Sequence, residues 1–184
     1  ISNPYAVGKY GVELNAKAMQ RYRFIHEELL RVAAGQLPAR ENWDLKIALC
    51  KHMYEDAEAA DQFRRRIPQL RTSAAAMRKE PDPVLALLME ELLHARNDLE
   101  LATGIYGVVK PAILAVYLRH KQETQQIVDQ PTIRILRECI ADLEEQIAWG
   151  REMIGELERC GVFPDASEFA AKLGSYIEAA GGID

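Results

Sequence analysis

Cysteine is scarce in this chain of 184 residues, and the few that occur are not arranged for metal or redox chemistry. Cys50, Cys139 and Cys160 lie far apart, and no Cys-x-x-Cys pair occurs. This spacing argues against a structural zinc site and against the disulfide framework of a secreted domain. It favours a reducing environment, so we expect a cytoplasmic protein.

Long apolar runs and clustered basic charge are also missing. No segment approaches the roughly 18 consecutive apolar residues of a membrane span, and the N-terminal residues lack the profile of a signal peptide. The formal net charge is −5, whereas nucleic-acid binding takes a clustered excess of Lys and Arg. The one basic run, Arg64-Arg65-Arg66, is better placed to complement the dipole at a helix end. We therefore expect neither a membrane nor a nucleic acid as partner.

Signatures of several enzyme classes are absent as well. No glycine-rich phosphate loop follows a strand, no serine or cysteine lies in a nucleophile elbow, and no alternating strand pattern occurs. What remains is 48% hydrophobic and 28% charged residues, a balance typical of one soluble domain with a sizeable core. Whether the chain is an enzyme stays open at this point.

Apolar residues recur at spacings of three and four along most of the chain, which predicts amphipathic helices. We expect them over about residues 12–34, 41–67, 83–102, 111–126, 133–161 and 166–180. Gly104, Gly107 and Pro111 interrupt the pattern, so the third and fourth segments form either one kinked helix or two. The clearest helix follows Asp129 as its cap and Pro131 in its first turn. Its inward seam is Ile133, Leu136, Ile140, Leu143, Ile147, Gly150, Ile154 and Leu157.

Some individual side chains can be placed from these helices. Leu14 belongs to the apolar face of the first helix, so we expect it to be buried. Trp43 and Trp149 are expected to pack helices together rather than to line a cofactor. Cys50 and Cys139 are expected to be small residues in the core or at its edge.

Two patterns that resemble metal ligands are better explained as solvated faces. Glu91 and His94 have the i, i+3 spacing of a ligand pair in dimetal bundles, but His94 projects away from the apolar seam of its helix. Glu138, Glu145 and Glu152 recur every seven residues opposite the Ile and Leu seam of the long late helix. We expect all five side chains to be solvated or to flank the core.

Four other polar residues fall on the apolar faces, where a polar group needs a partner. They are His26, His52, Asp56 and His120. His52 and Asp56 are one helical turn apart, so the carboxylate could orient the imidazole by accepting its N–H. A buried group of this kind is either a hydrogen-bonded structural cluster or a site for a metal or substrate.

The first two helices are expected to form an antiparallel hairpin, which would bring more polar groups together. His26 or Glu28 would then approach His52, Glu55 and Asp56 across one interface. These five residues are the candidate ligands for a metal ion.

Three motifs together resemble a group of ferritin-like proteins of uncharacterised function. They are Arg23-Phe24-Ile25-His26-Glu27-Glu28-Leu29-Leu30, the run from Lys51 to Asp61, and Asp129-Gln130-Pro131-Thr132 with Trp149-Gly150. The resemblance covers roughly residues 10 to 160. It implies a four-helix bundle that often holds two iron or manganese ions, bound by a carboxylate on one helix and an ExxH-type pair on the next, repeated in each half.

The chain departs from that ligand pattern. Glu28 fits the carboxylate of the first helix, and Glu55 or Asp56 fits the acidic member of the second pair, but the expected histidine three residues after Asp56 is Ala59. In the late helix the corresponding positions hold Leu143 and Gln146, which are poor ligands for such cations. The resemblance therefore implies, at most, an incomplete site for iron or manganese.

Two functions follow from these observations. We favour a ferritin-like bundle with a degenerate metal site that acts by binding another protein or by forming a homodimer. The alternative is an iron- or manganese-dependent oxidoreductase with an altered core site. In either case the expected fold is all-α: a ferritin-like four-helix bundle over residues 8–162 with a kinked or split third helix. A C-terminal helix over residues 163–184 would then pack on the bundle or on a partner.

Overall fold

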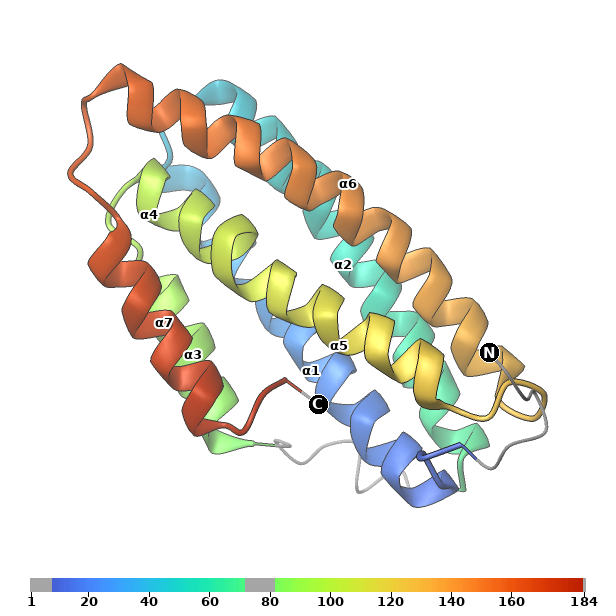
Figure 1. Ribbon diagram of the computed structural model, residues 1–184. Coiled ribbons are helices and arrows are strands. Elements are labelled where there is room, and N and C mark those ends of the chain that lie inside the picture. The colour runs from blue at the N-terminus through green and yellow to red at the C-terminus, as the bar shows by residue number, and fades with distance from the viewer. Residues whose placement is uncertain (1–7, 72–81, 184) are drawn as a thin grey trace.

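The computed structural model describes residues 8–71 and 82–183, and these residues form helices without strands (Figure 1). The predicted all-α class is therefore confirmed. The helices are α1 (Val12–Gln36), η1 (Leu37–Ala39), α2 (Trp43–Gln69), α3 (Pro83–Leu93), α4 (Asp98–Ala102), the π-helical segment η3 (Thr103–Val109), α5 (Lys110–Glu123), α6 (Gln130–Cys160) and α7 (Ser167–Ala179).

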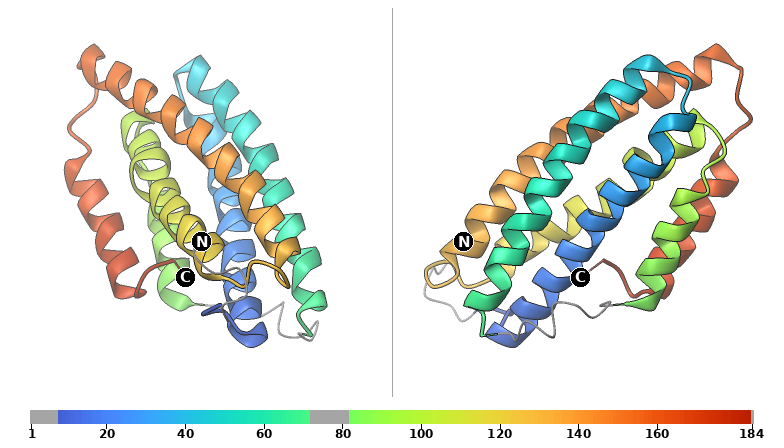
Figure 2. Two further views of the ribbon diagram at one scale, coloured as in Figure 1. Left: turned by 45° about the vertical axis from the view of Figure 1, so that its right-hand side comes forward. Right: turned by 180° about the vertical axis from the view of Figure 1, so that it is seen from behind.

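Two antiparallel hairpins build the main bundle. α1 pairs with α2, α5 pairs with α6, and α2 also contacts α6 (Figures 1 and 2). The α2 helix and the α4–η3–α5 segment run in the same direction, so a crossover that includes α3 connects the hairpins. α3 lies beside α7, and α7 also packs on η3. The core is the space enclosed by α1, α2, α4–η3–α5 and α6.

The third bundle helix does not break at Gly104, Gly107 and Pro111, where an interruption was predicted. From Asp98 to Glu123 the chain is one continuous helix whose middle part, Thr103–Val109, is π-helical. A π-helical turn is wider than an α-helical one and accommodates irregular positions inside a helix. The glycines and the proline are thus absorbed without a split.

The break falls instead at residues 94–97, between α3 and α4. The Asn97 side chain accepts a hydrogen bond from the Glu100 backbone N–H, which starts a new helix. At the end of α1, the Gln36 amide donates to the carbonyls of Leu93 and Ala95, groups that a helix end leaves without partners. Because Gln36 is distant in the sequence, the local pattern did not reveal this break.

One helix of the described residues, Asp98–Glu123, is long and apolar enough to cross a membrane by length and composition alone. Within its most apolar window, 56% of the helix is buried inside the structure. The core helix of a bundle has the same composition, because it is surrounded by other helices.

Three residues predicted to lie inside the structure are on its surface. Leu14 is 55% exposed and Trp43 is 70% exposed, and Cys50 is exposed as well. Leu14 lies in the first turn of α1. Trp43 and Cys50 lie on the side of α2 opposite Leu45 and Leu49, which are buried. The prediction for Cys139 is confirmed, since its side chain is buried.

Asp129 lies at the start of α6 as predicted, but its side chain does not cap that helix. Its Oδ2 accepts hydrogen bonds from Asn15 and Thr124, both at 2.6 Å, and its Oδ1 accepts from Arg66 at 2.8 Å and Thr132 at 2.6 Å. Burial opposes ionisation of Asp129, but these four donors outweigh it and lower the pKa of the carboxyl group. The carboxylate thereby joins both hairpins at one end of the bundle.

Candidate functional site

A buried carboxylate, an imidazole and an ammonium group meet in the core of the bundle. Asp56 on α2 accepts a hydrogen bond from His26 Nδ1 on α1, with 2.8 Å between Nδ1 and Oδ1. Its other oxygen, Oδ2, lies 2.9 Å from Nζ of Lys110, the first residue of α5. All three residues are buried, and Lys110 is only 1% exposed. The predicted approach of His26 and Asp56 across the hairpin is therefore confirmed.

This central group continues in two directions. The hydroxyl of Tyr117 lies 2.9 Å from His26 Nε2. Nδ1 donates to the Asp56 carboxylate, and a ring that carries its proton at Nδ1 accepts from the tyrosine at Nε2. In the other direction, Lys110 donates to Gln146 Oε1 at 2.5 Å, and Gln146 Nε2 donates to Glu55 Oε2 at 2.7 Å. A continuous hydrogen-bonded chain thus runs from Tyr117 in the core to the partly exposed Glu55.

The charges in this chain are set by burial and by the neighbouring groups. Burial opposes ionisation of Asp56, but the Lys110 ammonium and the His26 hydrogen bond outweigh it and hold the pKa of the carboxyl group below its usual value. Burial also raises the pKa of Tyr117 well above its usual value, so the phenol stays protonated and can donate. The core therefore contains a carboxylate whose counter-charge is an ammonium of the same chain.

His52 does not pair with Asp56, so that part of the prediction is wrong. Its Nδ1 lies 2.7 Å from the hydroxyl of Tyr106 on η3, and its ring packs edge-on against Tyr106 and Trp149. Asp56 is already bonded to groups from α1 and α5. Burial, reinforced by the positive charge of Lys110, lowers the pKa of His52 to about 4.

The third inward histidine, like the other two, has a tyrosine hydroxyl as its hydrogen-bond partner. His120 Nδ1 lies 3.0 Å from the hydroxyl of Tyr22, and the ring of Tyr10 stacks on His120 with 3.8 Å between centroids. Each buried histidine thus bonds a tyrosine on another helix. The sequence identified these histidines as inward residues but did not identify their partners.

The five predicted ligands do not converge. The structure joins His26 directly to Asp56, and it joins Glu55 to Asp56 only through Gln146 and Lys110. His52 belongs to a separate pair, and Glu28 accepts a hydrogen bond from Arg31. Among residues 8–71 and 82–183, no group of three or more His, Cys, Asp or Glu side chains is placed to hold a metal ion.

Lys110 is the functional residue that the sequence analysis missed. A signal was present, because Tyr106, Lys110, Ile113 and Tyr117 follow one another at spacings of four, three and four. This spacing places the lysine on the inward face of its helix. The position before Pro111 lay in the segment interpreted as an interruption, so the face was not traced through it.

The two patterns predicted to be solvated are confirmed. His94 is exposed, and Glu91 forms an ion pair with Lys172 on α7 at 2.7 Å. The three α6 carboxylates lie on its outer side and are exposed: Glu138, Glu145 and Glu152.

A small cavity of about 10 Å³ adjoins the polar core between α2 and α6, which is room for about one water molecule. Burial, together with the nearby Glu55, Glu145 and Glu138, raises the pKa of Asp142. The cavity is lined by His26, Glu55, Asp56, Ala59, Cys139, Asp142, Leu143 and Gln146.

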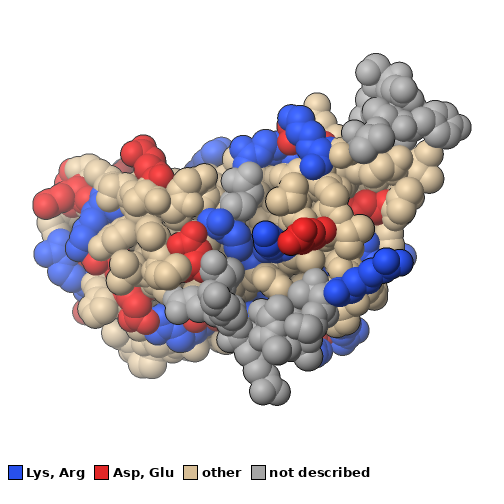
Figure 3. Space-filling model, turned by 90° about the horizontal axis from the view of Figure 1, so that it is seen from below, with Lys and Arg blue, Asp and Glu red and all other residues tan. Residues whose placement is uncertain are grey.

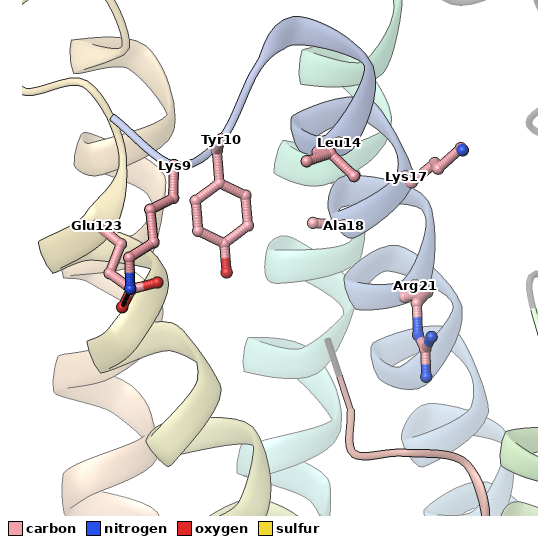
Figure 4. Close-up of a pocket in the computed structure, with 7 residues that line it drawn as sticks. All are labelled: Lys9, Tyr10, Leu14, Lys17, Ala18, Arg21 and Glu123. Atoms are coloured by element: carbon pink, nitrogen blue, oxygen red, sulfur yellow. Dashed lines mark hydrogen bonds and ion pairs between the residues drawn. The ribbon is translucent and has the colours of Figure 1, made fainter. Parts of the chain in front are cut away.

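Two larger hollows lie on the surface. One, of about 410 Å³, lies between the start of α1 and the end of α5, and its lining includes the cations Lys9, Lys17 and Arg21 (Figure 4). These cations form ion pairs with Glu123, Glu13 and Asp82. Seen from below, the molecule has basic and acidic side chains interspersed (Figure 3). The hollow therefore lacks the concentrated positive charge of a phosphate site.

The second hollow, of about 330 Å³, lies between α2 and α6 near His52. Its lining combines the apolar and aromatic Ile47, Ala48 and Trp149 with His52 and the charged Asp44, Lys51 and Glu145. It adjoins the exposed side of α2.

Comparison with known proteins identifies no family for this chain. No family model matches the chain, and neither the curated proteins nor the solved structures contain a match. The ferritin-like resemblance therefore remains a prediction.

Proposed function

We propose that this chain is a ferritin-like helical bundle that needs no metal ion and acts by binding another protein or a second copy of itself. The ferritin-like assignment is supported by the order of the helices, because two antiparallel hairpins joined by one long crossover are the connectivity of that fold. The observation that carries the proposed loss of metal dependence is the position of Lys110.

In dimetal bundles, metal cations balance the carboxylates that project into the core. Here the ammonium of Lys110 lies 2.9 Å from Asp56 Oδ2 and also donates to Gln146. A divalent cation at this place would be repelled by the ammonium at short range, where the surroundings screen charge poorly. The position beside Asp56 Oδ2 therefore does not fit a metal ion, and a cation of the chain itself stabilises the carboxylate.

One observation favours the alternative, an iron- or manganese-dependent oxidoreductase. The small cavity is lined by Glu55, Asp142 and Cys139 in addition to His26 and Asp56, which are donors of the types that bind such metals. The raised pKa of Asp142 reflects burial and the carboxylates gathered around it. An ion in the cavity would relieve their repulsion, so the two functions make opposite predictions about metal content.

Elemental analysis of protein purified without a metal-affinity tag separates them. We expect iron, manganese and zinc far below one equivalent in the wild type. Asp142→Asn should leave the metal content unchanged. This variant tests the cavity itself, because Asp142 lines the cavity but lies on the exposed side of α6. Near-stoichiometric metal that is lost in Asp142→Asn and in His26→Gln would overturn the proposal in favour of the oxidoreductase.

A further inference from the structure

The outward side of α2 carries a row of large apolar side chains. Trp43 is 70% exposed, Ile47 is 56% exposed and Tyr54 is 67% exposed, and Cys50 between them is exposed too. Figure 2 (right) shows this helix on the outside of the bundle. Isolated exposed apolar residues are normal, but a contiguous row on one helix marks an interaction surface.

The spacing of this row matches a helix–helix seam. Positions 43, 47, 50 and 54 are separated by four, three and four residues, and the half-buried Ala57 continues the pattern. Alternating spacings of this kind form the stripe along which two helices pack side by side. The outward face of α2 therefore fits another helix.

Charges along one edge of the row indicate which partner helix packs against it. Asp44, Lys51, Glu58 and Arg65 recur every seven residues, are exposed, and alternate in sign. When two identical helices pack side by side, the same edge of one helix faces the same edge of the other only if the helices are antiparallel. With a two-fold axis between Tyr54 and the next residue, Asp44 lies opposite Arg65 of the second copy and Lys51 lies opposite Glu58. In this register the two apolar rows overlap at Tyr54 and Ala57, and the Trp43 and Ile47 end of each row lies against positions 61 to 66 of the second copy.

We propose that this face of α2 is the interface of an antiparallel, two-fold symmetric homodimer. The inference rests on the proposed function and names the partner, a second copy of this chain. A two-fold interface uses the same patch on both subunits, as the self-complementary charges require. Lys51 and Arg65 also pair with Glu145 and Asp61 at the surface. Exposed ion pairs of this kind contribute little to stability. Pairing these cations with the second copy instead therefore costs little free energy.

The oligomeric state tests the apolar row. We expect sedimentation equilibrium to show a wild-type dimer, and we expect the double variant Ile47→Glu, Tyr54→Glu to weaken dimerisation by roughly a hundredfold or more. Leu87→Glu is the matched control, because Leu87 is 54% exposed on α3, which packs on α7 and α1, and it should leave the dimer intact. A wild type that is monomeric at every concentration, or a double variant that dimerises normally, would overturn the interface.

Charge reversal tests the register. Lys51→Glu should weaken dimerisation by about tenfold, and adding Glu58→Lys should restore it. Since the second change does not rebuild the pairs of Lys51 with Glu145 and Glu55, restored dimerisation reports the pairing across the interface. Two weakened single variants without rescue in the double variant would exclude this pairing.

Cross-linking gives an independent measure of the axis. In a Cys160→Ser background, Tyr54→Cys with Cys50→Ser should oxidise to a covalent dimer. The native Cys50 should not, because its two copies would lie about 13 Å apart along the helix. Cross-linking through Cys50 alone would contradict the proposed register. A metal-free monomer would end this inference but leave metal independence and binding to another protein standing.

Discussion

Nζ of Lys110 lies 2.9 Å from Oδ2 of Asp56 in the core of the helical bundle. His26 completes the environment of the carboxylate from the other side. The pair joins α2 to α5, one helix from each hairpin, and it supplies internally the positive charge that the resemblance to dimetal bundles would assign to metal ions.

Removing one charge of the Lys110–Asp56 pair should destabilise the fold more than replacing both residues by apolar ones. Lys110→Met leaves the buried Asp56 carboxylate with its His26 hydrogen bond but without the ammonium beside Oδ2, and it should lower the free energy of unfolding by about 3 to 5 kcal/mol. The double variant Lys110→Met, Asp56→Leu removes both charges and should be less destabilised than the single variant. Urea unfolding measures both. The exposed Lys51→Met should change stability by no more than about 1 kcal/mol, and an equally mild Lys110→Met would contradict the account.

The hydroxyl of Tyr117 should stabilise the fold by satisfying His26. Tyr117→Phe keeps the ring but leaves Nε2 of the buried imidazole without its donor, which should cost about 1 to 3 kcal/mol. Tyr54→Phe, at a tyrosine that is 67% exposed, is the matched control and should be close to neutral at concentrations where the chain is monomeric. Equal stability of the two variants in denaturant melts would argue against the hydrogen bond.

Acid should destabilise the protein through His52. Its pKa is lowered from 6.5 to about 4 in the folded state, so the unfolded chain binds the proton more readily. The contribution of His52 is therefore fully present above pH 6.5 and is lost as the pH falls towards 4. The full loss is roughly 2 to 4 kcal/mol.

Measuring the free energy of unfolding across that pH range tests this assignment. His52→Gln should flatten the dependence on pH, whereas His94→Gln, which replaces an exposed histidine, serves as the control. A dependence as steep in His52→Gln as in the wild type would show that another group is responsible.

Gly150 should be intolerant of any side chain. A Cβ at this position would lie 2.2 Å from Cβ of Tyr106, so α6 and η3 would have to separate. Gly150→Ala should therefore cost about 1 to 3 kcal/mol or more. Gly174→Ala is the matched control, because a Cβ there meets nothing within 4 Å and alanine favours the helix by about 1 kcal/mol. Thermal melts in which both variants behave alike would contradict the close packing.

The sequence predicted those features that depend on periodicity within one helix. The seam from Ile133 to Leu157 is buried except at the half-buried Ile154, and His26, Asp56 and His120 face inward as predicted. The contact of His26 with Asp56 could also be predicted, because it lies within a hairpin of adjacent helices. These inferences needed only the helical repeat and short-range connectivity.

The remaining parts of the site depend on contacts between distant segments. Lys110 reaches Asp56 because the chain continues through a π-helical segment, and its wider turns change which side chains face the core. The tyrosine partners of His52 and His26 lie on that same segment or beyond it. The surface position of Trp43 was missed because an apolar residue in a helix was assumed to face its own bundle.

Thermal unfolding with and without metal tests the central claim most directly. Wild-type protein would be dialysed against a strong chelator, returned to metal-free buffer, and melted alone and with excess Fe(II), Mn(II) or Zn(II). An ion that binds only the folded state raises the midpoint, and it raises it further the more tightly it binds. We predict the same midpoint in every sample, because Lys110 already neutralises Asp56. A midpoint that falls on chelation and recovers with one of these ions would contradict a metal-independent bundle.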